Sequence, residues 1–189
     1  MLLYKIVRPI IYIFIKLYRP AYIGLDNIPK DGAFILAGNH TSKLDPILVA
    51  SSTKRCVHFL AKDSLYKGIK KPLFKNMGII PVNRKIHDKD SLLTAKKFLE
   101  KNMTIGIFPE GTINRTDDTI MPFKIGAVKM SHDTDSMIVP FVIKGKYKPF
   151  FNNLRIIYFK PIYAKDDILD NENEKLMKII KKNLEDEEV

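Results

Sequence analysis

The chain has 189 residues, a net charge of +11 and one cysteine, and 46% of its residues are hydrophobic. This length and hydrophobic content are typical of a single folded domain and argue against intrinsic disorder. One cysteine excludes an internal disulfide, and one cysteine with four histidines disfavours a structural zinc site, so a reducing compartment is expected. No run of about 20 uninterrupted apolar residues is present, so no ordinary transmembrane helix is expected.

The basic residues are unevenly distributed. Residues 166–189 hold nine acidic side chains against four basic ones, so the rest of the chain is more basic than the total suggests. A basic surface attracts nucleic acid, anionic lipid or phosphorylated metabolites, and it can also serve solubility alone. Charge by itself does not choose among these partners.

Residues 1–20 are typical of an amphipathic helix on a membrane surface. Four basic residues and a tyrosine recur at intervals of three and four and fall within an arc of roughly 80°; they are Lys5, Arg8, Tyr12, Lys16 and Arg19. Apolar side chains cover most of the remaining circumference, which favours an interfacial helix with its basic strip toward lipid phosphates. Pro9 should kink or start this helix, and Pro20 should end it. A core helix with one solvated face is the alternative.

Short apolar strands alternate with amphipathic helices over the rest of the chain. Strands are predicted at 33–38, 57–61, 79–82, 104–108, 137–143 and 154–159, and helices from Pro46 and over 89–101, 124–132 and 171–183. Ser42 or Thr41 should lie near the cap of the helix from Pro46. The alternation predicts an α/β sandwich. With the amphipathic segment before it, the chain is expected to consist of a membrane-association helix, residues 1–20, and one larger domain, residues 21–189.

A histidine and an aspartate follow the first predicted strand. His40 comes directly after residues 33–38, and Asp45 lies five residues later, near a helix start. A carboxylate bonded to one imidazole nitrogen fixes the tautomer and makes the other nitrogen a better base. Ser42 would complete a hydrolase-like triad, but it lacks the Gly-x-Ser-x-Gly elbow that exposes a nucleophile. Alternatively, Asp45 only caps the helix and His40 bonds to the backbone.

Two further polar clusters also follow predicted strands. Phe108 to Thr112 offers a carboxylate, a glycine and a hydroxyl, and the strand at 79–82 leads to Arg84, a bidentate phosphate donor. Each cluster alone could be a turn or a surface arginine. In open α/β sheets, ligands bind at the carboxyl ends of strands. Three such clusters together therefore predict an active site at that edge.

In their order, these clusters resemble the four sequence blocks of the glycerolipid acyltransferases: Asn39-His40 with Asp45-Pro46, Gly78 to Arg84, Phe108 to Thr112, and Val139-Pro140. The chain is most similar to the bacterial 1-acylglycerol-3-phosphate O-acyltransferases, over roughly residues 33–142. The resemblance implies a single-domain glycerol-3-phosphate-acyltransferase-like αβ sandwich, with residues 21–189 as the acyltransferase domain. It also implies transfer of a fatty acyl group from a thioester to the sn-2 hydroxyl of 1-acylglycerol-3-phosphate, which makes phosphatidate.

The resemblance also implies roles for particular residues. His40 would be the general base, and Asp45 would orient it. Substrate binding would fall to six further residues: Arg84, Glu110, Gly111, Thr112, Asn39 and Lys124. Backbone N–H groups in the turn after His40 would stabilise the oxyanion. The single cysteine, Cys56, is expected to be a core residue, and His58, His87 and His132 are expected to be structural or on the surface.

Neither a metal nor a cofactor is expected, since the acyl donor, on coenzyme A or acyl carrier protein, is a substrate. The expected partners are anionic membrane lipids, a lysophospholipid and acyl carrier protein, and not nucleic acid. The expected location is the cytoplasmic face of the cell membrane, as a peripheral or monotopic protein. Three alternatives stay open: a different lysolipid acceptor, a hydrolase using the same pair, and a noncatalytic basic membrane-binding module.

Overall fold

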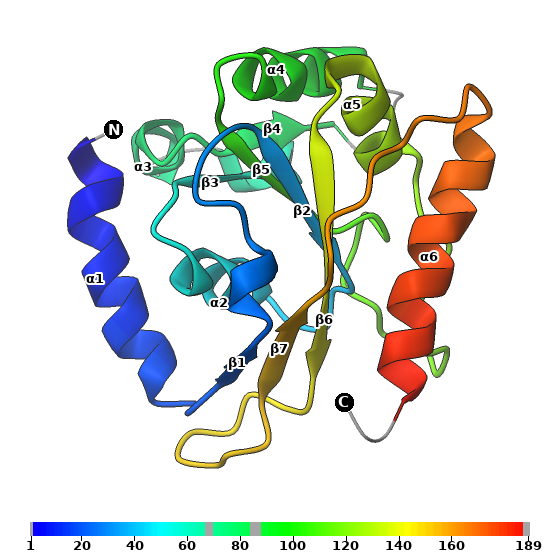
Figure 1. Ribbon diagram of the computed structural model, residues 1–189. Helices are drawn as coiled ribbons and strands as arrows, with labels where there is room; N and C mark the ends of the chain where they lie inside the picture. The colour runs from blue at the N-terminus through cyan, green and yellow to red at the C-terminus, as the bar shows by residue number, and fades with distance from the viewer. Residues whose placement is uncertain (1, 67–69, 84–87, 187–189) are drawn as a thin grey trace.

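A computed structural model describes residues 2–66, 70–83 and 88–186. In this part of the chain, a seven-stranded sheet has the order β1-β7-β6-β2-β5-β3-β4 and helices on both faces (Figure 1). The strands are β1 Ala21–Ile23, β2 Phe34–Gly38, β3 Val57–Lys62, β4 Ile80–Val82, β5 Thr104–Ile107, β6 Met137–Lys144 and β7 Arg155–Tyr158. Neighbouring strands are parallel except β6 and β7, which are antiparallel. The predicted α/β fold is confirmed.

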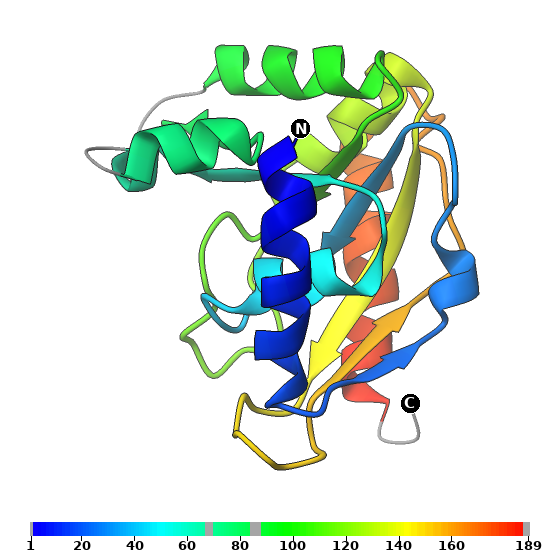
Figure 2. The same ribbon diagram turned by 90° about the vertical axis from the view of Figure 1, so that its left-hand side faces the viewer.

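The helices form two layers around this sheet. One layer holds α1 Leu2–Lys16 and α2 Asp45–Ser52, and the other holds α4 Lys89–Leu99, α5 Gly126–Thr134 and α6 Leu169–Glu185 (Figures 1 and 2). The short helix α3, Lys70–Asn76, precedes the edge strand β4. Two 3₁₀ turns cover Leu25–Asn27 and Asp63–Tyr66. Each face of the sheet therefore has its own apolar core.

Strand β2 lies at the centre because its sequence has no polar side chain. All five of its residues, Phe34–Gly38, are buried, as expected for a strand covered on both faces. It pairs with β6 on one side and with β5 on the other. The carboxyl ends of these three strands therefore meet at one edge of the sheet.

The predicted elements are present, with small shifts and two additions. Strand β1 has only three residues and was not predicted, and neither was α3. The first helix begins at Leu2 and ends at Lys16, so Pro9 does not start it and Pro20 lies beyond its end. Helix α2 begins at Asp45, and its N-cap Leu44 makes no side-chain cap bond, so neither Thr41 nor Ser42 is the cap.

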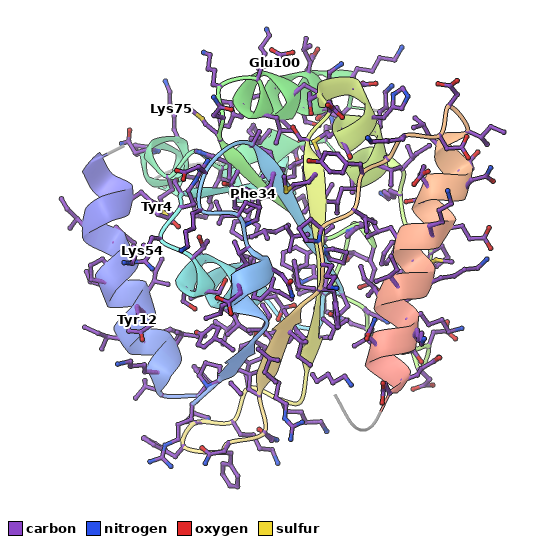
Figure 3. All side chains as sticks on the ribbon, viewed as in Figure 1. Tyr4, Tyr12, Phe34, Lys54, Lys75 and Glu100 are labelled. Atoms are coloured by element: carbon purple, nitrogen blue, oxygen red, sulfur yellow. The ribbon has the colours of Figure 1, made fainter. Side chains whose placement is uncertain are left out.

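Helix α1 presents one side to the protein and an apolar side to solvent. Tyr4 points toward the body of the protein (Figure 3), and its hydroxyl donates to the Arg55 carbonyl at 3.1 Å. Ile15 is fully buried, and Arg8 donates through Nε to the Thr53 carbonyl at 3.0 Å. The predicted basic strip is therefore wrong at Arg8, which faces inward. The exposed apolar side chains are Ile6, Ile10, Ile13, Phe14 and Leu17.

Among the helices in the described ranges, none is long and apolar enough to cross a bilayer. The division of the chain into residues 1–20 and 21–189 stays a prediction.

Candidate active site

The polar clusters meet at the carboxyl edge of the parallel strands. His40 comes two residues after the end of β2, and Glu110 comes three residues after the end of β5. The two segments are joined at His40: its N–H donates to Glu110 Oε1 at 2.7 Å, and its carbonyl accepts from the Asn114 N–H at 2.8 Å. The structure thus brings these residues together at this edge, and their role as an active site stays a prediction.

His40 and Asp45 form a hydrogen-bonded pair. Nδ1 of His40 lies 2.8 Å from Oδ2 of Asp45, whose side chain is fully buried, while the His40 side chain is 12% exposed. An ionised carboxylate can only accept, so Nδ1 carries the proton and Nε2 keeps its lone pair. The alternative that His40 bonds only to the backbone is therefore wrong. The pair has the arrangement of a general base and its orienting acid.

The Asp45 carboxylate accepts further hydrogen bonds from the turn that follows His40. Oδ2 also accepts from the N–H groups of Thr41 at 2.6 Å and Ser42 at 2.7 Å, and Oδ1 accepts from the Thr41 hydroxyl at 3.3 Å. These amides donate to Asp45, so the prediction that the turn after His40 supplies the oxyanion donors is corrected for both. Ser42 Oγ accepts from the Leu44 N–H at 3.2 Å, which gives it a role in the turn.

Tyr147 is a residue of this site that the sequence did not indicate. Its hydroxyl donates to Oδ1 of Asp45 at 2.7 Å, from a loop 102 residues away. Burial, together with the negative charge of Asp45, raises the pKa of Tyr147, so the hydroxyl stays protonated and remains a donor. No local motif marks this tyrosine, because the contact exists only after β6 has joined β2.

An aromatic stack supports the imidazole. The His40 ring lies against Phe108, with centroids 4.1 Å apart and planes inclined by 15°. Phe108 in turn contacts the rings of Phe59 and Phe141, both at 6.0 Å. Asp45 and this apolar stack thus hold the imidazole in a defined orientation, which pre-organises it for proton transfer.

Glu110 braces the site. Its two carboxylate oxygens accept from the backbone N–H groups of His40 and Met121, at 2.7 and 2.9 Å, and its side chain is buried. Burial raises the pKa of the Glu110 carboxyl, and the hydrogen bonds from these two N–H groups oppose that rise. The carboxylate therefore ties the segment after β2 to that after β5. Its predicted contact with substrate stays a prediction.

Asn39 has a structural role. Its side-chain amide donates to the Ile143 carbonyl at 3.0 Å and accepts from the Ile143 N–H at 2.7 Å, and the residue is only 3% exposed. The amide thus extends the β2–β6 pairing by one step beyond the strand. The predicted substrate contact of Asn39 is corrected accordingly.

Lys124 and Gly111 come together beside this turn. Gly111 has a φ of +73°, and the Lys124 ammonium lies 3.1 Å from where a Cβ on Gly111 would stand. The Lys124 N–H also donates to the Pro109 carbonyl at 2.9 Å. Thr112 is exposed next to them. The structure thus gathers three of the predicted substrate-binding residues, whereas Arg84 lies outside the described residues, as does His87.

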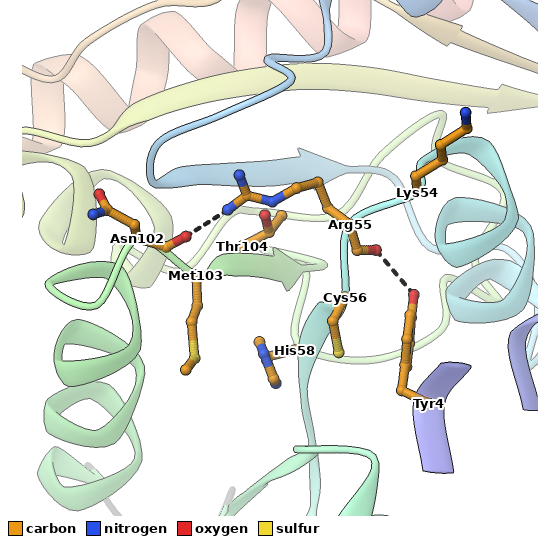
Figure 4. A pocket seen from close by; sticks show the side chains of 8 residues that line it. All are labelled: Tyr4, Lys54, Arg55, Cys56, His58, Asn102, Met103 and Thr104. Atoms are coloured by element: carbon orange, nitrogen blue, oxygen red, sulfur yellow. Dashed lines mark hydrogen bonds between the residues drawn. The ribbon is translucent and has the colours of Figure 1, made fainter. Parts of the chain in front are cut away.

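A shallow cavity lies at the opposite edge of the sheet. It has a volume of about 340 Å³ and is lined by residues that include Tyr4, Arg55, Cys56 and His58 (Figure 4). Arg55 is engaged by the carbonyls of Gly32 and Asn102. Burial raises the pKa of Cys56 to about 11, so its thiol stays protonated at neutral pH and is a poor nucleophile.

The described residues contain no candidate metal site. Within residues 2–66, 70–83 and 88–186, no group of three or more His, Cys, Asp or Glu residues is arranged to hold a metal ion.

Comparison with known proteins agrees with this geometry. A protein family described as Acyltransferase matches residues 19–144. The chain belongs to the acyltransferase family. The match spans the elements from β1 through β6, including the segments that carry His40, Asp45 and Glu110.

Curated relatives belong to one enzyme group. The chain is 34% identical over 134 residues to a 1-acyl-sn-glycerol-3-phosphate acyltransferase of Borreliella burgdorferi, covering 69% of this chain and 53% of that protein. It is 29% identical over 147 residues to one of Bacillus subtilis, covering 75% of this chain and 72% of that protein. The chain thus spans about half the length of the first relative.

A solved structure shares the fold of this chain. The crystal structure of the 1-acyl-sn-glycerophosphate acyltransferase from Thermotoga maritima superposes with a TM-score of 0.78 at 23% identity. The superposition covers 96% of this chain and 79% of that one. At this identity, the likeness supports the fold.

Proposed function

We propose that this acyltransferase moves a fatty acyl group from an acyl thioester to the free sn-2 hydroxyl of 1-acylglycerol-3-phosphate and so makes phosphatidate. The observation that carries the proposal is the His40–Asp45 pair, which lies at the carboxyl edge of the sheet inside the region that matches the family. The names of the relatives support the choice of acceptor. The donor is a thioester of coenzyme A or of acyl carrier protein.

His40 acts as the general base in this reaction. Nε2 takes the proton of the acceptor hydroxyl as its oxygen attacks the thioester carbonyl, which forms a tetrahedral intermediate. The C–S bond then breaks, and the imidazolium returns its proton to the departing thiolate. Asp45 stabilises the imidazolium through the 2.8 Å contact with Nδ1. Thiolate is already a good leaving group, so no enzyme nucleophile is needed.

The acceptor phosphate binds beside the Glu110–Thr112 turn. Lys124 next to Gly111 provides a positive charge there, and Thr112 provides a hydroxyl. Arg84 is the second cation of this proposed phosphate site. In the sequence it comes two residues after β4, a strand that is parallel to β3.

The proposed location of the protein is the cytoplasmic face of an anionic membrane. The exposed apolar side of α1 supports this placement, because such a side is stable when it lies in the boundary between head groups and acyl chains. Basic residues and the absence of acidic ones in residues 1–20 favour anionic lipids.

The direct test uses purified protein, lysophosphatidate and a labelled thioester of either donor. Wild type is compared with His40→Ala and with His132→Ala, which removes an exposed imidazole on the opposite helix layer. We expect phosphatidate from wild type and His132→Ala, and a loss of about 100- to 10,000-fold for His40→Ala. Full activity of His40→Ala would refute the assigned base.

Other products would identify the alternatives. Free fatty acid without an acylated lipid would indicate a hydrolase, and acylation of a different lysolipid would change the acceptor. Vesicle binding that is unaffected by His40→Ala, with no turnover of either donor, would indicate a noncatalytic membrane-binding module.

A further inference from the structure

The loop between β6 and β7 exposes two adjacent aromatic rings. Phe150 is 69% exposed and Phe151 is 59% exposed, the former being the largest exposure among the big apolar side chains of the described residues. Burying such rings is favourable, so a soluble protein seldom places two side by side at a loop tip without a partner. The loop covers residues 145–154, and we call it the phenylalanine loop.

The tip of the phenylalanine loop is held in a defined conformation. At its base, Gly145 has a φ of +86°, and a Cβ there would stand 1.7 Å from the Asn153 carbonyl oxygen, so the two ends of the loop are in close contact. Nearer the tip, the Phe151 N–H donates to the Lys148 carbonyl at 3.2 Å. Phe150 itself has a φ of +68°, a conformation that bulky residues rarely adopt. The backbone therefore presents the rings outward.

The loop is continuous with the exposed side of α1. The Phe150 N–H donates to the Leu17 carbonyl at 2.7 Å, and the rings of Tyr147 and Tyr18 meet edge to face at 5.6 Å. Figures 1 and 2 both show the loop beside the C-terminal end of α1. Phe150 and Phe151 thus extend the apolar surface that Ile13, Phe14 and Leu17 begin.

Charge around the loop identifies the partner. Residues 144–155 contain no acidic residue and four basic ones, Lys144, Lys146, Lys148 and Arg155. The Lys148 ammonium lies 5.7 Å from the centre of the Phe151 ring, so a cation sits directly above the apolar tip. Lys144 donates to the Asp186 carbonyl, so the exposed cations of the loop are Lys146, Lys148 and Arg155. An apolar tip with cations around it is complementary to acyl chains beneath anionic head groups.

We infer that the phenylalanine loop is a second membrane-binding element, which inserts Phe150 and Phe151 into an anionic bilayer beside α1. The inference rests on the membrane placement proposed above and goes beyond it in naming a site outside α1. Two contacts fix the orientation of the protein on the bilayer, whereas one helix leaves rotation about its axis free. Tyr147 is in the same loop and bonds to Asp45, so insertion brings the catalytic edge to the lipid surface.

A single tryptophan tests the insertion directly. The chain has no tryptophan, so Phe151→Trp introduces a unique tryptophan at the tip, which can be excited selectively at about 295 nm. The matched control is Ile168→Trp, at a 60% exposed position just before α6, in the opposite helix layer. With vesicles of phosphatidylglycerol that carry bromine on the acyl chains, we expect a blue shift and quenching for Phe151→Trp and neither for Ile168→Trp. Equal responses from the two probes would overturn the inference.

Removal of the rings provides a second measurement. Phe150→Ser/Phe151→Ser should fold normally, because both side chains are exposed, and it should lose about tenfold or more in affinity for anionic vesicles. It should retain activity on a short-chain lysophosphatidate that is dissolved as monomers and lose activity on vesicle-borne acceptor. Unchanged vesicle affinity would overturn the inference.

The outcomes separate this inference from the proposed function. If wild type binds vesicles through the loop but makes no phosphatidate, the membrane element stands and the acyltransferase reaction fails. If phosphatidate forms while the loop variant binds as wild type does, the reaction stands and the loop assignment fails. If wild type does not bind anionic vesicles at all, the placement of both α1 and the loop is wrong.

Discussion

Asp45 receives hydrogen bonds from separate parts of the chain. His40 and the amides of Thr41 and Ser42 reach it from the same turn, and Tyr147 reaches it from the phenylalanine loop. Burying a polar group costs free energy unless it is hydrogen-bonded, and these donors satisfy the Asp45 carboxylate. The orientation of the imidazole therefore depends on further contacts of Asp45 besides the one with His40.

We predict that Tyr147→Phe lowers kcat about tenfold and leaves KM unchanged. The variant keeps the ring contact with Tyr18 but removes a donor from Asp45, so it loosens the carboxylate that holds His40. The NMR resonance of the His40 Nδ1 proton should move in the variant, which a purely structural change elsewhere would not cause. Phe159→Leu, in the other helix layer's core, is the control for packing alone. An unchanged kcat would contradict the role of Tyr147.

Glu110 provides a second prediction at this scale. Glu110→Gln keeps the size of the side chain but replaces one acceptor with a donor, which then faces the N–H of His40 or of Met121. We expect a loss of about 1–3 kcal/mol in the free energy of unfolding, measured by urea denaturation, and a loss of activity. Unchanged stability and activity would show that this brace is dispensable.

At the residue scale, the sequence predicts contacts between residues that lie close together in the chain. His40 and Asp45 are five residues apart and meet within a single turn, so their pairing could be inferred from the sequence. The hydrogen bond from Tyr147 and the clamp of Asn39 on Ile143 each span more than 100 residues and depend on how the strands pair. A short motif carries no information on strand pairing, so it indicates neither the bond from Tyr147 to Asp45 nor the bond between Asn39 and Ile143.

Among the elements, α1 shows why an amphipathic pattern can mislead. Its apolar residues cover more of the circumference than one contact requires, so the sequence alone did not tell which part faces the protein. The structure buries Tyr4 and Ile15 and leaves Ile10 and Ile13 outside. Arg8 points inward because a backbone carbonyl at Thr53 is there to accept from it.

Two isoleucines in α1 give a matched pair of variants. Ile15 is fully buried and Ile13 is 68% exposed. We expect Ile15→Ala to lower the free energy of unfolding by about 2–5 kcal/mol, and Ile13→Ala to leave it unchanged. Ile13→Ala should instead weaken binding to anionic vesicles several-fold, as measured by co-sedimentation. The reverse pattern would mean that α1 turns its other side to the protein.

His58 couples the pairing of β3 and β4 to pH. Its ring is buried between Phe98 and the Gly78 carbonyl, which lies 2.9 Å from Nδ1, and burial lowers the pKa of His58. The unfolded chain therefore binds a proton more readily, so stability falls as pH drops below about 6.5, by up to about 1.4 kcal/mol per pH unit. In urea titrations from pH 7.5 to 5, His58→Gln should show a shallower fall. Parallel curves would contradict this.

The close contact of β2 and β6 depends on Gly38. A Cβ at this position would lie 2.4 Å from the ring and the carbonyl oxygen of Phe141, so Gly38→Ala forces the strands apart. We expect a loss of about 1–3 kcal/mol or more in thermal or urea unfolding. Gly126→Ala, at the start of α5, is the control. Its Cβ would lie at an ordinary contact distance, 3.5 Å, from the Ile107 and Leu92 side chains, so this variant should not destabilise the protein. Equal stability of the two variants would refute the argument.

Across the whole molecule, α1 and α6 differ in net charge. Helix α1 has three basic residues and no acidic one, whereas the four acidic residues of α6 are matched by four lysines. The two helices lie on opposite sides of the sheet (Figure 1), so a bilayer with anionic lipids attracts α1 and has no net attraction for α6. Raising the salt from about 0.1 to 0.5 M should weaken binding to anionic vesicles strongly and to neutral vesicles only slightly, because salt screens exposed charges. Salt-independent binding would exclude an electrostatic contribution.

The overall topology was only partly accessible from the sequence. The alternation of strands and helices gave the fold class and nearly every strand. The order of the strands and the antiparallel direction of β7 depend on tertiary packing. The sequence does not predict strand β1, because three residues are too few to show a periodic pattern.

The pairing of β1 with β7 has a consequence for synthesis. It joins the segment that directly follows α1 to the last strand of the sheet, and Asn27 donates to the Tyr158 carbonyl across 131 residues of sequence. A ribosome adds roughly 5–20 residues per second, so α1 emerges several seconds before the strand that will anchor its C-terminal end. Under the proposed membrane placement, the bilayer is the first apolar surface that the nascent helix meets. The sheet then closes, and the catalytic edge assembles, on a chain that is already at the membrane.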